Sequence, residues 1–287
     1  MSADSDLRKV FKHIEESEEI RISSTARLAG GSINEVYRLQ TSKGKRVLKV
    51  NEADRFPGMF DAEQAGLNIL RSKSKFAIPE VGSAGTSGNF SYLLLEYIPE
   101  GRQSRDFWNI FAENLAALHQ NSAPEFGFPS SNYIGSLPQF NNSEVSAADF
   151  YIRQRLEPQL RMAEEQGFKF DSLGAALKNI TAAIPEEPPA LIHGDLWSGN
   201  YLISEAGLPC LIDPAVSYGP REMDLAMMKL FGGFPEEVFR RYSEIIPLPD
   251  GFQDRVPLWQ LYYLLVHLNI FGSSYFSQVV AILKKYS

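Results

Sequence analysis

The segment Leu191–Asn200 constrains this chain more than any other stretch, because it sets polar side chains at a fixed spacing. It reads Leu-Ile-His-Gly-Asp-Leu-Trp-Ser-Gly-Asn, so an aspartate follows the histidine by two residues and an asparagine follows the aspartate by five. A loop this short can turn the carboxylate and the amide toward one cleft. The segment therefore predicts a polar site built from a single loop.

A further carboxylate, Asp213, follows in Leu-Ile-Asp-Pro, at the end of a predicted strand that closes a hairpin. The order of Asp195, Asn200 and Asp213 matches the catalytic loop and the metal-binding aspartate of kinases. Gly194 and Pro214 replace the arginine and the phenylalanine that protein kinases have there. Phosphoryl transfer needs a base for the acceptor hydroxyl and oxygen ligands for a metal on the phosphates. We predict Asp195 as the base and Asn200 and Asp213 as Mg²⁺ ligands; the alternative is that both aspartates only cap turns.

Two other residues are predicted to support this loop. We expect His193 to hydrogen-bond the loop backbone rather than to transfer protons. Asp224, in Arg-Glu-Met-Asp-Leu, either accepts hydrogen bonds from backbone amides of the loop or lies on a helix surface. The sequence leaves both positions open for Asp224.

The first part of the chain offers a cation for the phosphates of ATP. Lys49 lies between apolar residues on a predicted strand, which suits an ammonium directed into a cleft. Its alternative is a solvated lysine on the polar face of that strand. Glu63, on the following predicted helix, is the expected ion-pair partner of Lys49, with Asp61 and Glu52 as competitors.

Backbone groups are predicted to complete the nucleotide site. Gly30, Gly31 and Ser32 stand where a glycine-rich loop would cover the phosphates, although glycine occupies only one of the three expected positions. Their amides and the serine hydroxyl suit phosphate oxygens, and a plain β-turn is the alternative. Glu96 and Ile98, at the end of an apolar strand, are the positions where main-chain groups would bind adenine.

The pattern of elements predicts an α+β fold with two lobes. Residues 1–98 read as short strands with one helix near 60–71, and Pro99-Glu100-Gly101 breaks the chain. Residues 99–287 read as mainly helical, with strands only at 201–203 and 210–212. We predict an N-lobe that clamps ATP and a C-lobe that carries the catalytic loop, with a cleft between them.

Composition excludes several other classes of protein. The net charge of −7 disfavours nucleic acid as a partner, because phosphate backbones need a basic surface. One cysteine, Cys210, forms no internal disulfide, and residues 1–19 lack the apolar core of a secretory signal. Polar residues interrupt the uncharged stretch 256–283, so we expect two core helices there and no membrane span. A cytoplasmic protein fits these features.

Residues 193–200 resemble the signature of the fructosamine/ketosamine kinases, which are relatives of the aminoglycoside and choline kinases, and Trp197 separates this family from the broader group. The resemblance continues through 132–139, 150–159, 213–222, 231–234 and 261–269, and so covers nearly the whole chain.

This resemblance implies a protein-kinase-like fold and transfer of the γ-phosphate of ATP to a ketosamine hydroxyl, typically O3, in the repair of glycated proteins. It gives Asp195, Asn200, Asp213 and Lys49, the last paired with Glu63, the roles predicted above. Trp197 would lie beside the acceptor, with its ring against the sugar; the alternative is a core tryptophan that braces the loop. Some members have a redox-sensitive cysteine where this chain has Ser32, so no thiol switch is expected at that position.

Three other functions compete with this interpretation. A protein kinase is disfavoured, because only eleven residues separate Asp213 from Asp224 (224 − 213) and no Ala-Pro-Glu follows. A small-molecule kinase for another acceptor, such as an aminoglycoside or choline, would share every catalytic residue. A non-catalytic nucleotide-binding relative is the third. The sequence leaves open whether the amine is a free small molecule or a protein lysine, and it leaves the oligomeric state open.

Overall fold

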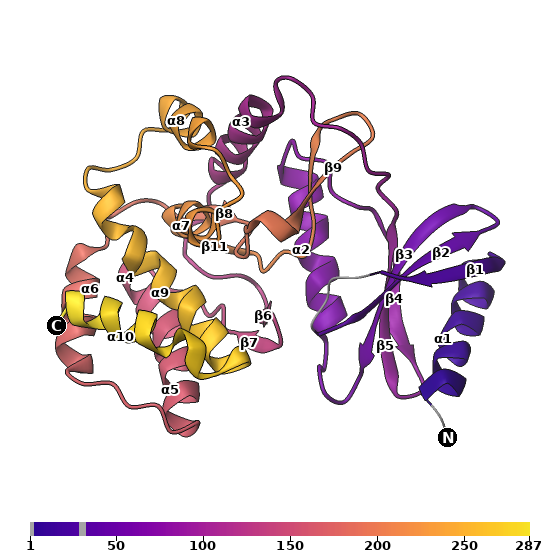
Figure 1. Ribbon diagram of the computed structural model, residues 1–287, viewed down its shortest axis with the longest axis horizontal. Helices are drawn as coiled ribbons and strands as arrows, with labels where there is room; N and C mark the ends of the chain where they lie inside the picture. Colours follow the sequence, from indigo (N-terminus) through magenta and orange to yellow (C-terminus); the bar gives the residue numbers. More distant parts are fainter. Residues whose placement is uncertain (1–2, 29–32) are drawn as a thin grey trace.

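The computed structural model describes residues 3–28 and 33–287, and the chain folds into two lobes of unequal size (Figure 1). The smaller lobe is a sheet with two helices, and the larger lobe is mainly helical. This arrangement confirms the predicted α+β class. Gly30, Gly31 and Ser32 lie outside the described residues.

A five-stranded antiparallel sheet forms the N-lobe. Its strands are β1 (Ile22–Arg27), β2 (Glu35–Thr41), β3 (Gly44–Glu52), β4 (Val81–Ser87) and β5 (Phe90–Glu96), in the order β1-β2-β3-β5-β4. A tight turn after Thr41 joins β2 to β3. The central strand β3 places Lys49 opposite Val36 of β2 and Leu93 of β5.

The N-lobe has two helices where the sequence predicted one. The expected helix is α2 (Met59–Lys73), and the other is α1 (Ala3–Ser17) on the outer side of the sheet (Figure 1). Val10 and Ile14, four residues apart on one face of α1, are fully buried together with Leu48 and Leu94 of the sheet. Their neighbours in sequence are mostly polar or charged, and the sequence predicted no helix in this segment.

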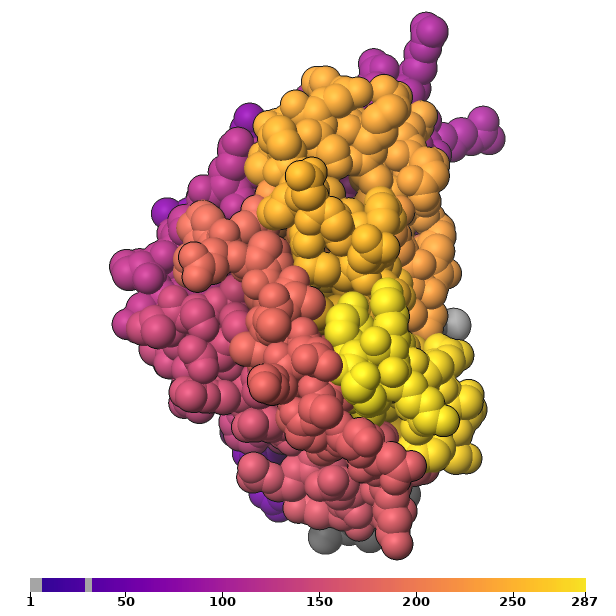
Figure 2. Space-filling view, turned by 90° about the vertical axis from the view of Figure 1, so that its left-hand side faces the viewer, coloured from indigo at the N-terminus to yellow at the C-terminus, as the bar shows by residue number. Residues whose placement is uncertain are grey.

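The C-lobe contains helices α3 (Phe107–His119), α4 (Ala147–Asp149), α5 (Glu157–Glu165), α6 (Leu173–Ala183), α7 (Glu222–Leu230), α8 (Glu236–Ile245), α9 (Phe252–Phe271) and α10 (Phe276–Lys285). Figure 2 shows the outer face of this lobe, where the yellow C-terminal segment lies against the orange and salmon ones. As predicted, the uncharged stretch forms two helices, with a break at Gly272 and the 3-10 turn Ser273–Tyr275. Within the residues that the structure describes, no helix is long and apolar enough to cross a membrane.

Short strands in the C-lobe outnumber the two that the sequence predicted. The six are β6 (Asn132–Ile134), β7 (Leu137–Gln139), β8 (Ala190–Ile192), β9 (Tyr201–Ile203), β10 (Pro209–Leu211) and β11 (Ser217–Gly219). They pair as β6 with β7, β8 with β11 and β9 with β10. Strands of three residues show no detectable period, so partners elsewhere in the chain decide them. The expectation of two strands was therefore wrong.

A π-helical segment, Phe150–Leu156, lies between α4 and α5. Pro158 has no amide hydrogen, so the carbonyl of Gln154 lacks its usual helical partner. Arg155 Nη1 donates to that carbonyl instead, at 3.0 Å. Pro158 stands at the start of α5, so the chain continues as a helix past the π-helical segment.

Candidate active site

The predicted catalytic loop, residues 193–200, connects β8 to β9 and ends in a 3-10 turn, Ser198–Asn200. Asn200 is buried, and its Nδ2 donates to the backbone oxygen of Asp195 at 2.8 Å and to Asp195 Oδ2 at 3.1 Å. The predicted base and the predicted metal ligand are therefore in direct contact. Because Nδ2 makes these bonds, the side-chain oxygen of Asn200 stays free to bind a cation.

Gly194 fits this loop for a steric reason. Its φ is +84°, and a Cβ there would lie 2.0 Å from the backbone oxygen of Ala215. The carbonyl of His193 accepts a hydrogen bond from the amide of Ala215 at 2.9 Å, which holds the two segments together. A side chain at position 194 would separate them, so the arginine of protein kinases has no room here.

Asp224 lies in the first turn of α7 with no exposed surface. Its two carboxylate oxygens accept hydrogen bonds from the backbone amides of His193 and Gly194, each at 2.8 Å. His119 Nε2 lies 3.2 Å from the same carboxylate, and its Nδ1 lies 2.8 Å from the hydroxyl of Tyr242. The sequence left two alternatives for Asp224, a bond to the loop backbone or a place on a helix surface, and the structure shows the bond to the loop backbone.

His193 is also bonded to the backbone rather than exposed to the cleft. Its Nε2 lies 2.9 Å from the carbonyl of Ile212, and its Nδ1 lies 3.3 Å from the amide of Asp195. A carbonyl only accepts and an amide only donates, so Nε2 carries the proton. Burial lowers the pKa of His193, which keeps the ring neutral. The ring therefore links the residue before Asp213 to the predicted base.

Lys49 reaches from the N-lobe into the C-lobe. Its Nζ lies 2.5 Å from Glu63 Oε1 and 2.6 Å from Asp213 Oδ1. Of the three acids considered as partners, Glu63 is the one that pairs, and Asp61 and Glu52 are exposed. Burial alone would lower the pKa of Lys49, but the adjacent Asp213 and Glu63 carboxylates outweigh it and raise that pKa. The lysine therefore remains an ammonium in a nearly closed site.

Asp213 follows the β9–β10 hairpin at a φ of +54°, a left-handed conformation that is rare outside glycine. The amide of Ile212 donates to the carbonyl of Asn200 at 3.0 Å, so the catalytic loop fixes the approach to Asp213. The side chain of Asp213 is 45% exposed, compared with 8% for that of Lys49. One carboxylate oxygen faces the lysine, and the group remains open to the cleft.

The Asp195 carboxyl is the one in this site whose pKa moves close to neutrality. Burial raises it to about 7, the hydrogen bond from Asn200 opposes that rise, and the charges of Asp213 and Asp224 add to it. A carboxylate with a pKa near the working pH is suited to accept a proton and to release it again.

The exposed ring of Trp197 contradicts the interpretation of this residue as a core tryptophan. Its side chain is 40% exposed. A Cβ on Gly199 would lie 2.3 Å from ring atom Cη2 of Trp197, so the ring lies on the backbone of the glycine. One part of the indole packs on Gly199, and the rest is exposed.

The two positions predicted to bind adenine, Glu96 and Ile98, lie at the end of β5 and just beyond it. The amide of Glu96 already donates to the carbonyl of Glu80 at 2.8 Å, and the side chain of Glu96 accepts from the amide of Glu80 at 3.1 Å. Ile98 lies two residues beyond the strand and is half-buried. The amide of Glu96 is therefore already engaged within the sheet.

A buried polar network behind Asp213 received no role from sequence. Asn132 Nδ2 donates to the carbonyl of Val216 at 2.8 Å, and Gln139 Nε2 donates to that of Ala215 at 3.0 Å. Tyr262 donates its hydroxyl hydrogen to Gln139 Oε1 at 2.8 Å. The signal was present, because 132–139 and 261–269 belong to the stretches that carry the family resemblance. The role of these side chains depends on the distant backbone carbonyls that they hydrogen-bond, and a sequence does not show that pairing.

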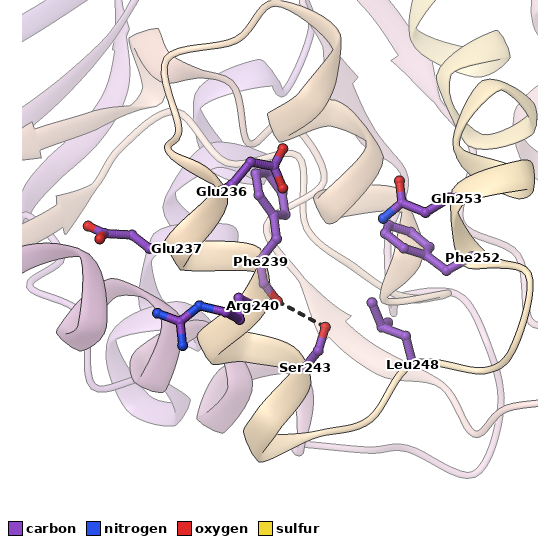
Figure 3. A pocket seen from close by; sticks show the side chains of 8 residues that line it. All are labelled: Glu236, Glu237, Phe239, Arg240, Ser243, Leu248, Phe252 and Gln253. Carbon is purple, nitrogen blue, oxygen red and sulfur yellow. Dashed lines mark hydrogen bonds between the residues drawn. The ribbon is translucent and has the colours of Figure 1, made fainter.

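A second concavity of about 400 Å³ lies between α8 and the start of α9 (Figure 3). Its lining comprises Glu236, Glu237, Phe239, Arg240, Ser243, Leu248, Phe252 and Gln253. None of the predicted site residues lines it, and we assign it no role.

Comparison with known proteins gives a consistent result. The chain matches the sequence model of the family described as fructosamine kinase over residues 6–287. A protein named "Probable ketoamine kinase" from Enterococcus faecium is 41% identical over 271 residues, which cover 90% of this chain and 94% of that protein. One from Synechocystis with a name of the same kind is 38% identical over 268 residues, covering 92% and 90%.

Solved structures are similar over the same length. The crystal structure of a Haemophilus somnus protein provisionally named fructosamine-3-kinase matches with a TM-score of 0.88 at 28% identity, covering 98% of this chain and 97% of that one. A Thermobifida fusca protein with the same provisional name matches with a TM-score of 0.83 at 32% identity, covering 95% and 96%. An aminoglycoside phosphotransferase in ternary complex with AMP-PNP and hygromycin B has a TM-score of 0.65 at 20% identity, covering 96% and 98%, and supports the fold alone.

Proposed function

The chain belongs to the fructosamine kinase family, and we propose on that basis that it transfers the γ-phosphoryl group of ATP to a sugar hydroxyl of a ketosamine, O3 in the first place. Its fold is that of the protein-kinase-like phosphotransferases, as the sequence predicted. One observation carries the proposal. Asp195, Asn200 and Asp213 of the C-lobe lie in one connected hydrogen-bonded site, and Lys49 of the N-lobe reaches it.

Asp195 acts as the base in this proposal. Its carboxylate accepts the proton of the acceptor hydroxyl while that oxygen forms a bond to the γ-phosphorus and the bond from phosphorus to the β–γ bridging oxygen breaks. ADP leaves with the electrons of that bond, and the proton passes from Asp195 to solvent. The raised pKa suits both halves of this cycle, because the carboxyl holds and releases a proton near pH 7.

Lys49 positions the phosphates. Its ammonium is buried between Glu63 and Asp213, so its direction is fixed before ATP binds. A charge held in place needs little reorganisation as charge develops on the phosphoryl oxygens. Glu63 is itself buried, and burial raises its pKa although Lys49 opposes the rise. Glu63 thus depends on the lysine as much as the lysine depends on it.

The chemistry of Asn200 and Asp213 fits Mg²⁺. The described residues contain no group of three or more His, Cys, Asp or Glu side chains that would cage a metal by themselves. Mg²⁺ in kinases commonly takes one or two carboxylates and completes its shell with water and phosphate oxygens. The partly exposed carboxylate of Asp213 and the free amide oxygen of Asn200 are donors of that kind. When bound, the ion would neutralise charge on the phosphates.

Trp197 would support the acceptor. Its exposed indole surface, two residues after Asp195 in the same loop, suits the apolar face of a sugar ring. A phosphate on O3 makes the linkage between sugar and amine labile, so the reaction would serve deglycation, on free ketosamines or on glycated lysine of proteins. A cytoplasmic location goes with this role.

The test combines an active-site variant with a choice of acceptors. Asp195→Asn should lower kcat with fructosamine or ribulosamine by about 10² to 10⁴-fold while ATP still binds, because the amide cannot accept the proton. Asp61→Asn, an exposed carboxylate on α2, is the matched control and should keep its rate. An unchanged rate in Asp195→Asn would remove this residue from the mechanism. Turnover by the wild type only on choline or an aminoglycoside would replace the ketosamine with that acceptor.

A further inference from the structure

The ends of α7 and α9 carry a cluster of four aromatic rings, Phe231, His267, Phe271 and Tyr275, which we call the aromatic cluster. His267 is at its centre, with ring centroids 4.8 Å from Phe231, 5.5 Å from Phe271 and 5.1 Å from Tyr275. Phe231 is 42% exposed and Phe271 is 53% exposed. Large apolar rings gathered at a surface commonly mark a binding site.

One side of the aromatic cluster adjoins the catalytic loop. Gly233 follows Phe231 by two residues, at a φ of +91°, and a Cβ on it would lie 2.5 Å from the Cβ of Ser198. The backbone at Gly233 is therefore in contact with the residue after Trp197. The exposed rings of Trp197 and Phe231 project from two segments that touch each other.

On its other side, the aromatic cluster is linked through α9 to the turn between β6 and β7 and so to the N-lobe. Ile270 lies three residues after His267, so the two share a face of α9. A Cβ on Gly135, in the turn between β6 and β7, would lie 2.8 Å from Ile270 Cδ1 and 3.6 Å from Ile33 Cδ1. Ile33 belongs to the N-lobe segment next to the predicted phosphate loop. This end of α9 and the N-lobe residue Ile33 therefore both lie against the turn at Gly135.

The chemistry of the aromatic cluster is that of an uncharged apolar surface. His267 Nδ1 donates to the carbonyl of Tyr263 at 2.7 Å, and burial lowers the pKa of His267, so its ring is neutral at pH 7. None of the cation–ring contacts found among the described residues involves these four rings. Such a surface gains from contact with an apolar or aromatic group and offers no counter-ion to a carboxylate.

We propose that the aromatic cluster is a subsite of the acceptor pocket, which binds the substituent on the amine nitrogen of a ketosamine and favours apolar, above all aromatic, substituents. The inference rests on the proposed function. With a sugar hydroxyl at Asp195 and the sugar on Trp197, the amine is only a few bonds away, and its substituent extends past Trp197 toward Phe231. The contact between Ser198, next to Trp197, and Gly233, two residues after Phe231, identifies this occupant.

Two synthetic acceptors that share the sugar and the amine class test the subsite. They are 1-deoxy-1-methylamino-fructose and 1-deoxy-1-benzylamino-fructose. The wild type should have a KM lower by about tenfold for the benzyl compound, with a similar kcat, because the phenyl ring buries apolar area in both ground and transition states. Phe271→Ala and Phe231→Ala should each reduce the benzyl-to-methyl ratio of kcat/KM to within about twofold of one.

Phe140→Ala is the matched control, since Phe140 is 37% exposed and makes no ring contact with the aromatic cluster in the described chain. It should keep the wild-type ratio. Equal kcat/KM for both acceptors in the wild type, or a preference that survives both cluster variants, would overturn the subsite. Turnover of the methyl compound in those same experiments would show that the ketosamine kinase activity stands. No turnover of either compound would instead reject the proposed function.

Discussion

At the scale of single residues, the site depends on carboxylates in unequal surroundings. Asp195 loses water on folding and gains only the amide of Asn200, so its pKa rises to about 7. Asp224 is buried too, yet it receives two backbone amides and a histidine, and these hydrogen bonds lower its pKa despite burial. Two aspartates thus have different properties: the pKa of Asp195 suits proton transfer, whereas Asp224 stays ionised and holds the loop.

The first prediction concerns pH. Protonated Asp195 cannot accept the proton of the acceptor, so activity requires its carboxylate. Because the pKa is about 7, kcat/KM should fall as pH drops below 7, by about tenfold per pH unit, and should level off above 7. Initial rates from pH 5 to 9, with recovery of activity after return to pH 7.5 as the control for unfolding, measure this. A plateau that extends down to pH 5 would contradict it.

At the scale of elements, the first turn of α7 holds the catalytic loop. The loop has two consecutive amides, at His193 and Gly194, that point at one carboxylate. The carboxylate is in turn held by His119 of α3. The geometry of the loop therefore depends on how α3 and α7, which are distant from it in sequence, pack against each other.

The second prediction follows from that packing. Asp224→Asn replaces one acceptor oxygen by an NH₂ donor, so at least one buried donor loses its partner. The free energy of unfolding should fall by about 1 to 3 kcal/mol, and kcat should fall as well. Urea unfolding and steady-state rates measure the two effects. Asp254→Asn, an exposed aspartate in the first turn of α9, is the control and should change little. Stability equal to the wild type would show that Asp224 does not hold the loop.

At the scale of the molecule, the two lobes share one hydrophobic core. A single buried cluster contains Leu67 and Leu93 from the N-lobe and Phe111 and Leu211 from the C-lobe. Backbone hydrogen bonds also cross, since Ala77 bonds with β10. A shared core predicts that the lobes unfold together.

The third prediction uses the positions of the tryptophans. All three, Trp108, Trp197 and Trp259, lie in the C-lobe. Leu67→Ala, in the N-lobe, should lower the free energy of unfolding by about 2 to 5 kcal/mol, and tryptophan fluorescence should report the same shift as far-UV circular dichroism. Leu208→Ala, at an exposed leucine, is the control. A fluorescence transition that stays at the wild-type position would mean that the lobes unfold separately.

The sequence by itself determined the chemical groups and their order along the chain. Asp195 and Asn200 are five residues apart in one loop, and such local spacing largely sets how two side chains meet. The family resemblance predicted the fold class because it covers nearly the whole chain. The helix α2 was predictable from the helical spacing of its apolar positions, and α9 was predictable from its long uncharged run, which is apolar on every side and shows little period.

Only the tertiary structure decided the contacts between distant segments. It chose Glu63 over its two neighbours for Lys49, although 14 residues separate the pair, and it placed Asp213 at the same ammonium from 164 residues away. It buried one face of α1 on the sheet and brought the rings of Phe231 and His267 into contact. The physical reason is that burial and charge act through space, whereas a sequence records only neighbours along the chain.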